Sequence, residues 1–225
     1  MDVDSLKFIF EQSENAIKFD EQKGFQQLST AFQMECECLQ CGSHKCSKKG
    51  CSDYDKCTRK KKNEGLKGVD ILFKTPEFLY LIEAKDYRKC VNPPTDHIIL
   101  EVAKKFRDTL FGVWCIGFIS ADESCKDFLK KIRMEDISIK FVFHFESPVA
   151  PYSSGLYGSK RKIVSLLDIQ EKLAQKLGPM KDYLHVVDMD TMAIPSTAYS
   201  WKVEEKYETV EIDRSSAQRC AGRYF

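Results

Sequence analysis

The sequence GVDILFKTPEFLYLIEAKDYR, residues 68–88, holds two short apolar runs separated by a polar break. Residues 69–73 and 78–84 are rich in β-branched and aromatic side chains, a composition typical of strands. The break between them, KTPE, contains a proline and reads as a turn. The stretch therefore predicts a β-hairpin, and we take this hairpin as the centre of the predicted fold.

Three ionisable residues, Asp70, Glu83 and Lys85, interrupt this hairpin. Side chains alternate between the two faces of a strand, so Glu83 and Lys85 must point the same way, while Asp70 comes up on the neighbouring strand. Two carboxylates and a backbone carbonyl, that of Ala84, would offer the hard oxygen ligands that Mg²⁺ or Mn²⁺ prefers. Lys85 would orient the attacking water or stabilise developing charge. A surface ion pair on a structural hairpin is the alternative interpretation.

An Asp, a gap of about a dozen residues and then Glu-x-Lys at the end of an apolar strand resembles the PD-(D/E)xK nuclease superfamily. The resemblance is confined to residues 68–88. It implies a restriction-endonuclease-like α/β fold, in which a mixed sheet is flanked by helices, and a Mg²⁺- or Mn²⁺-dependent nuclease. It also implies DNA rather than RNA as the substrate. In that family an acidic residue on the first core helix often joins the metal site, and Glu14 and Glu21 are the candidates, with Glu21 favoured; both could equally be solvated helix carboxylates.

Length and composition predict one main domain spanning residues 1–225, with a Cys-rich insertion at residues 36–67. The 35 basic and 34 acidic side chains nearly cancel, so any affinity for nucleic acid must come from local patches. No apolar run is long enough for a membrane span, and residues 1–12 do not resemble a signal peptide. We therefore expect a soluble, cytoplasmic protein whose cysteines are thiols or metal ligands. The sequence leaves open whether copies of the chain form a homo-oligomer.

The Cys-rich insertion has more thiols than packing would require. Close pairs suit tetrahedral thiolate coordination, which would stabilise a loop that has almost no apolar core. Zinc is the favoured metal. An iron–sulfur cluster, disulfides and free thiols remain alternatives, and the spacing fits neither one standard finger nor a fixed number of sites. The candidate ligands are Cys36, Cys38, Cys41, His44, Cys46, Cys51 and Cys57.

The same insertion is strongly basic. Nine Lys and Arg residues face three acidic residues between positions 45 and 67, and phosphate is the obvious counter-charge. A solvated basic loop is the alternative. The nucleic-acid contacts expected here are Arg59, Lys60, Lys61 and Lys62.

Periodicity predicts the remaining elements. Residues 4–35 read as one or two helices, and residues 95–114 as an amphipathic helix whose Lys104 and Lys105 could contact nucleic acid. Residues 115–135 read as a loop followed by a short helix, and residues 137–145 as a strand in which His144 is expected to be structural. A helix at 161–177 and a strand at 183–189 follow, whereas residues 193–225 show no period.

Taken together, these patterns predict a metal-dependent nuclease. A nucleic-acid-binding or adaptor protein on the same fold, without catalysis, is the alternative. A third hypothesis is a metal-stabilised interaction domain whose basic loop binds an acidic protein surface.

Overall fold

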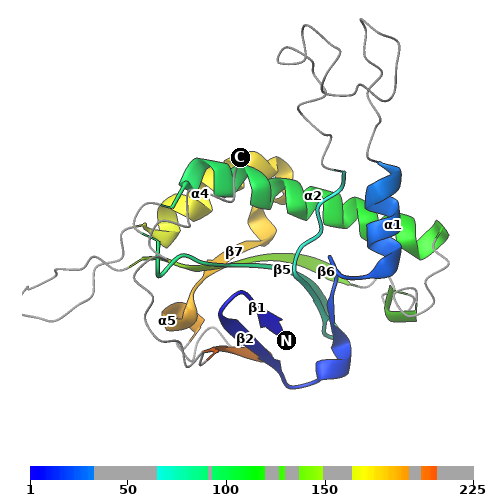
Figure 1. Cartoon of the computed structure of the whole chain (residues 1–225), viewed down its shortest axis with the longest axis horizontal. Helices are drawn as coiled ribbons and strands as arrows, with labels where there is room; N and C mark the ends of the chain where they lie inside the picture. Colours follow the sequence, from blue (N-terminus) through cyan, green and yellow to red (C-terminus); the bar gives the residue numbers. More distant parts are fainter. Residues whose placement is uncertain are drawn as a thin grey trace, which may run out of the picture.

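The computed structural model describes residues 1–32, 65–90, 93–119, 127–129, 137–148, 164–192 and 199–206. The candidate metal ligands from Cys36 to Cys57 and the basic run from Arg59 to Lys62 lie outside the described residues, so what the sequence predicts for them stays a prediction. The described part is a mixed α/β arrangement. A five-stranded sheet lies between a layer of helices and a second, three-stranded sheet (Figure 1).

The central sheet is mixed and is built around the predicted hairpin. Its strand order is β3–β4–β5–β6–β7; β3, β4 and β5 are antiparallel, whereas β5, β6 and β7 are parallel. Ile71 lies opposite Ile82, which confirms the hairpin. The strands expected near residues 137–145 and 183–189 are also confirmed. The strands are β3 (Ala16–Lys18), β4 (Ile71–Lys74), β5 (Phe78–Asp86), β6 (Ser138–Glu146) and β7 (Leu184–Val187).

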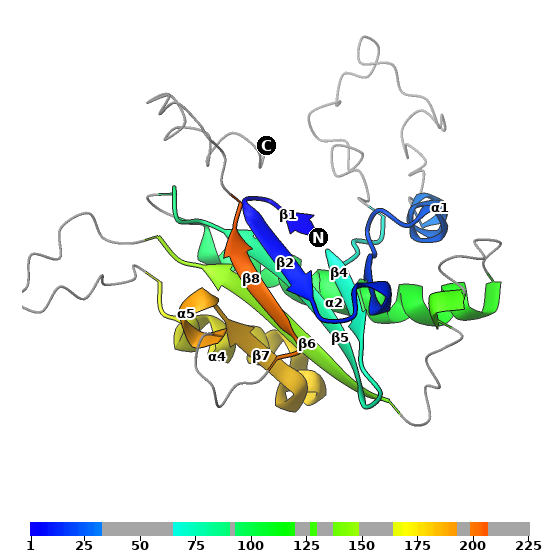
Figure 2. The same ribbon diagram turned by 90° about the horizontal axis from the view of Figure 1, so that it is seen from below.

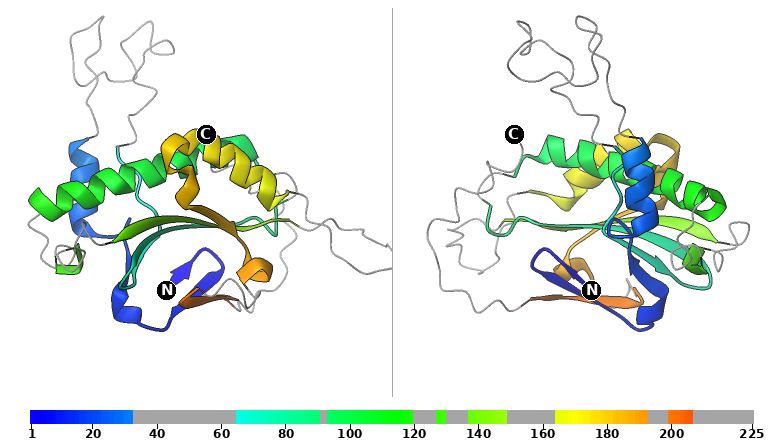
Figure 3. Two further views of the ribbon diagram at one scale, coloured as in Figure 1. Left: turned by 180° about the vertical axis from the view of Figure 1, so that it is seen from behind. Right: turned by 45° about the vertical axis from the view of Figure 1, so that its right-hand side comes forward.

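Helices α2 (Thr95–Ile119) and α4 (Leu166–Leu177) cover one face of this sheet, and α1 (Lys23–Ala31) lies beside α2 (Figures 1 and 3). Parallel strands need a crossover connection, and α2 supplies it between β5 and β6. The prediction of a loop from residue 115 is wrong for residues 115–119, because α2 continues through them. No helix in the described ranges is long and apolar enough to span a membrane.

The opposite face of the central sheet is covered by a small antiparallel sheet of β1 (Asp2–Val3), β2 (Leu6–Phe10) and β8 (Trp201–Glu205). Figure 2 shows β2 and β8 side by side across the central strands. Aromatic residues fill the space between the two sheets, and Phe10 lies 4.7 Å from Phe73 between ring centroids. Short 3-10 turns at Ser13–Asn15 and Gly178–Tyr183 and the one-turn helix α5 (Met189–Met192) complete the described elements.

The helical prediction for residues 4–35 is wrong in its first half. Leu6, Phe8 and Phe10 are buried and the residues between them are exposed, which is the period of a strand rather than of a helix. The partner of β2 is β8, almost two hundred residues later, in a region without a local pattern. Pairing with so distant a strand is a tertiary effect that local periodicity does not show.

Candidate active site

The predicted trio converges where β4 begins and β5 ends. Asp70 immediately precedes β4, and its Oδ2 accepts a hydrogen bond of 2.8 Å from the backbone N–H of Ala84. Leu72 and Leu81 lie in the core on the α2 side of the sheet, so strand alternation places Asp70, Glu83 and Lys85 on that side too. Lys85 Nζ lies 3.1 Å from Glu83 Oε1. The structure thus brings two carboxylates and one ammonium together on one face, as the alternation predicts.

A second ammonium, from α2, joins this cluster. Lys105 Nζ lies 2.8 and 2.9 Å from the two carboxylate oxygens of Glu83 and 3.4 Å from Asp70 Oδ1. The sequence predicts Lys105 as a nucleic-acid contact, and its ion pairs with Glu83 and Asp70 were missed. The sequence signal for this contact was the place of Lys105 on the polar side of the helix that follows Lys85. Within the cluster, two carboxylates face two ammonium groups.

Burial gives this cluster unusual electrostatics. Glu83 is completely buried. Burial, and then the neighbouring charge of Asp70, raise the pKa of Glu83 to about 8, against the opposing effect of Lys105 and Lys85. Burial alone would lower the pKa of Lys85, but the charges of Glu83 and Asp70 outweigh it and raise that pKa. The same balance raises the pKa of Lys105. Strongly perturbed pKa values in one cluster are typical of functional sites.

Among the acidic residues before α1, Asp20 lies next to the cluster. Partial desolvation and the charge of Asp70 raise the pKa of Asp20, although its side chain still reaches solvent. Glu21, the residue favoured from sequence, is 61% exposed and pairs with Lys18 at 2.7 Å. Glu14 lies in an exposed turn. The structure therefore brings neither Glu21 nor Glu14 to the cluster. The sequence expectation rested on a helix through these positions, whereas α1 begins at Lys23.

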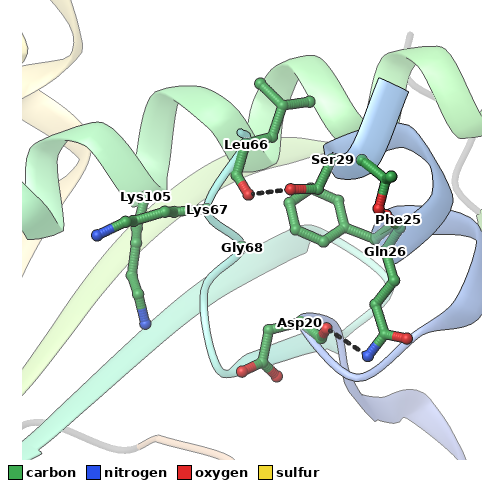
Figure 4. A pocket seen from close by; sticks show the side chains of 9 residues that line it. Asp20, Phe25, Gln26, Ser29, Leu66, Lys67, Gly68 and Lys105 are labelled. Carbon is green, nitrogen blue, oxygen red and sulfur yellow. Dashed lines mark hydrogen bonds between the residues drawn. The ribbon is translucent and has the colours of Figure 1, made fainter. Parts of the chain in front are cut away.

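A pocket of about 350 Å³ adjoins the cluster, with Asp20 and Lys105 in its wall (Figure 4). Phe25 forms its apolar part and packs tightly against Gly68 and Gly112. A Cβ on either glycine would come within 2.8 Å of the ring, so only glycine allows α1 this close. A hydrogen bond of 2.7 Å from Ser29 Oγ to the carbonyl of Leu66 fastens α1 to the segment before β4. The pocket is lined by Asp20, Phe25, Gln26, Ser29, Thr30, Leu66, Lys67, Gly68 and Lys105.

Helix α2 also holds the segment that leads into Asp70. Thr109 Oγ1 accepts a 2.9 Å bond from the Val69 N–H, and Asp108 Oδ2 accepts a 2.8 Å bond from the Lys67 N–H. Lys104, which the sequence predicts as a nucleic-acid contact, donates to the carbonyl of Gly65 at 2.9 Å and pairs with Asp108. In the structure Lys104 is thus a positioning residue for this segment.

Asp70, Glu83 and the Ala84 carbonyl are oxygen donors of the kind that Mg²⁺ and Mn²⁺ prefer. The three carboxylate oxygens around Lys105 Nζ mark a position that accepts positive charge, so the donor set fits a hard cation. Only two carboxylates meet there, and no group of three or more His, Cys, Asp or Glu side chains suited to a metal occurs within the described ranges. Cys90 and Cys115, the cysteines in those ranges, are buried.

A second polar cluster lies on the other face of the central sheet, on β6. Glu146 Oε1 accepts hydrogen bonds from His144 Nε2 at 2.9 Å and from the Met189 N–H at 2.8 Å. His144 is fully buried and contacts Phe8 edge to face. The sequence places His144 on the less apolar side of its strand as a structural residue. That side is in fact covered by the small sheet, and His144 is a buried hydrogen-bonding residue within it.

Comparison with known proteins shows similarity over part of this chain. No family model matches the chain, and no solved structure matches it. The chain is similar to a cysteine–tRNA ligase of Neisseria meningitidis serogroup A, with 32% identity over 121 residues. The match covers 50% of this chain and 17% of that ligase, so about half of this chain is similar to a small part of that protein.

Proposed function

We propose that this chain is a metal-dependent nuclease with a restriction-endonuclease-like fold, and that it hydrolyses phosphodiester bonds, preferably in DNA. The observation that carries the proposal is the convergence of Asp70, Glu83 and Lys85 on one face, with Glu83 buried and its pKa raised to about 8. Keeping a carboxylate in so unfavourable a place costs stability, and such costs are typical of functional sites.

The chain's own residues would divide the work as follows. Asp70, Glu83 and the Ala84 carbonyl would hold Mg²⁺ or Mn²⁺, and the Ala84 N–H keeps Asp70 oriented for this. When bound, the cation would polarise the phosphate and acidify a water. Lys85, fixed beside Glu83, would hold the nucleophilic water or neutralise charge on the oxygens of the pentacoordinate phosphorus. The pocket beside Lys105 and Asp20 would receive the adjoining part of the substrate.

Nucleic acid as the partner class has some independent support, since the similar relative is by its name a ligase of tRNA. RNA therefore belongs in the test beside DNA. The second candidate function is a nucleic-acid-binding or adaptor protein that does not cut. The observation that favours it is Lys105, whose ammonium neutralises the carboxylates that a metal would need.

The test is incubation of the purified chain with labelled single- and double-stranded DNA, RNA and tRNA, in Mg²⁺, in Mn²⁺ and in chelator. Asp70→Asn, Glu83→Gln and Lys85→Ala should each lower turnover by about two to three orders of magnitude, because each removes a preorganised charge. If these variants still fold and still bind nucleic acid, the loss of turnover lies in the hydrolytic step itself. If the parent chain binds nucleic acid but cuts none of these substrates with either metal, the non-catalytic candidate replaces the nuclease.

We also propose that the segment with Cys36, Cys38, Cys41, His44, Cys46, Cys51 and Cys57 holds structural zinc and that Arg59, Lys60, Lys61 and Lys62 contact phosphate. Elemental analysis of protein purified without chelator should find at least about one zinc per chain. Iron in place of zinc would point to an iron–sulfur cluster. If neither metal is found, these thiols do not bind a structural metal.

A further inference from the structure

Lys105 occupies the position that a hard cation would take. Its Nζ is surrounded by both oxygens of Glu83 and by Oδ1 of Asp70, at 2.8, 2.9 and 3.4 Å. Lys85 differs from it, because its ion pair, at 3.1 Å, is with Oε1 of Glu83 alone. Among the two ammonium groups, Lys105 is therefore the one that bridges the two carboxylates.

The charges of the cluster do not allow both Lys105 and a divalent cation. With all four side chains ionised, Asp70 and Glu83 are neutralised by Lys85 and Lys105. A divalent cation added to this nearly dry cluster would leave a net charge of +2, which burial makes unfavourable. The cation also needs the same carboxylate oxygens that Lys105 holds. Binding of one must therefore weaken binding of the other.

The structure offers the side chain of Lys105 another place. Lys105 already forms part of the wall of the 350 Å³ pocket, together with Lys67 and Asp20 (Figure 4). Asp20 interacts electrostatically with Lys105 from the α1 side. Turning away from Glu83 would bring the ammonium into this pocket, where it would face an incoming ligand, whereas the ammonium of Lys67 pairs with Glu101 at 3.9 Å. A cationic side chain beside a hydrolytic centre fits a phosphate of the substrate strand.

We propose that Lys105 is an exchangeable cation. It neutralises Asp70 and Glu83 in the metal-free protein, is displaced by Mg²⁺ or Mn²⁺, and then binds a phosphate of the nucleic-acid strand from within the pocket. This inference rests on the proposed nuclease function. It assigns to one residue both the neutralisation of the two carboxylates and the coupling of metal binding to substrate binding.

The first test measures Mn²⁺ affinity of the full chain by electron paramagnetic resonance of the free ion. Lys105→Met removes the charge and keeps the length of the side chain. Arg107→Met is the matched control, because Arg107 is exposed on the same helix. We expect Lys105→Met to bind Mn²⁺ at least about ten times more tightly than the parent, and Arg107→Met to bind it like the parent. Glu83→Gln should lose the binding.

The outcomes separate the inference from the function on which it rests. Equal Mn²⁺ affinity in the parent and in Lys105→Met, with loss in Glu83→Gln, would overturn the exchange and leave the nuclease proposal standing. Absence of Glu83-dependent Mn²⁺ binding in every variant would overturn both.

A second measurement uses the parent chain and does not depend on the folding of Lys105→Met. Reductive ¹³C-methylation gives each lysine an NMR signal, and Lys105→Arg assigns the one from Lys105. On saturation with Mg²⁺ this signal should move toward the position of exposed lysines. A signal that stays in place while Glu83-dependent metal binding is complete would overturn the displacement.

The phosphate step has its own readout. With saturating Ca²⁺, which supports binding without turnover in this test, Lys105→Met should bind a single-stranded oligonucleotide about three to ten times more weakly. The salt dependence of binding should fall by about one phosphate contact. Arg107→Met should retain more of both. If the two variants lose affinity and salt slope equally, Lys105 acts only as one more positive charge of α2, and this step is overturned.

Discussion

Two buried glutamates on neighbouring parallel strands have opposite surroundings. Glu83 on β5 points toward α2 and meets two ammonium groups, a second carboxylate and a nearby open pocket. Glu146 on β6 points toward the small sheet and α5, where His144 and a backbone N–H satisfy it and close packing surrounds it. Glu146 behaves like a structural residue that needs its charge or its acceptor oxygen for folding. Glu83 has the properties of a residue that the fold tolerates at a cost.

The first prediction tests this difference between the two glutamates by varying the pH, with chelator present. Folding raises the pKa of Glu83 from 4.5 to about 8, so the folded state keeps a proton that the unfolded state releases. Stability from this group is complete below about pH 4.5 and is lost as the pH rises through 8. Glu83→Gln carries no such proton. Its advantage over the parent should grow from near zero at pH 4.5 to on the order of a few kcal/mol above pH 8.

Denaturant unfolding of both proteins across this pH range is the measurement, and Glu21→Gln is the control, because Glu21 is exposed and should show no such trend. If the stability difference between Glu83→Gln and the parent stays constant or falls as the pH rises, Glu83 is held in a stabilising ion pair. Glu83 and Glu146 would then both be stabilising residues.

The second prediction concerns Glu146. Glu146→Ala removes the acceptor for two donors, His144 Nε2 and the Met189 N–H, in a site that is 5% exposed. Unpaired buried donors are costly, and we expect a loss of about 2 to 4 kcal/mol in the free energy of unfolding. Any nuclease activity should be unchanged in protein that is still folded. Thermal unfolding and a cleavage assay below the transition check both parts, and a loss of activity without a loss of stability would move the functional site to the small-sheet face.

The hairpin and its three ionisable residues were predictable because local patterns set them. Strand alternation fixes which side chains share a face, and the proline-containing break fixes where the chain turns. The small sheet was not predictable in the same way, since β2 pairs with β8 from the far end of the described chain. Lys105 illustrates the limit at the site. Its helix was expected, but whether a lysine on a polar helix face reaches solvent or a buried carboxylate depends on how α2 lies on the sheet.

The acidic residues before α1 also show that sequence alone does not tell which side chain reaches the cluster. They give the last prediction. Asp20 and Glu21 are adjacent in sequence, yet Asp20 interacts with Asp70 and lines the pocket, whereas Glu21 pairs with Lys18 in solvent. Asp20→Asn removes a charge that interacts with Asp70 and Lys105, and we expect turnover to fall about tenfold, roughly 1.4 kcal/mol of barrier. Glu21→Gln removes an equal charge one residue away and should leave turnover within about twofold, since exposed ion pairs contribute little.

Single-turnover cleavage with Mg²⁺ compares the two variants under conditions in which both are fully folded. A tenfold loss in Glu21→Gln with none in Asp20→Asn would mean that the segment before α1 rearranges when substrate binds. The sequence-based choice of Glu21 would then describe the working site better than the arrangement in this structure does.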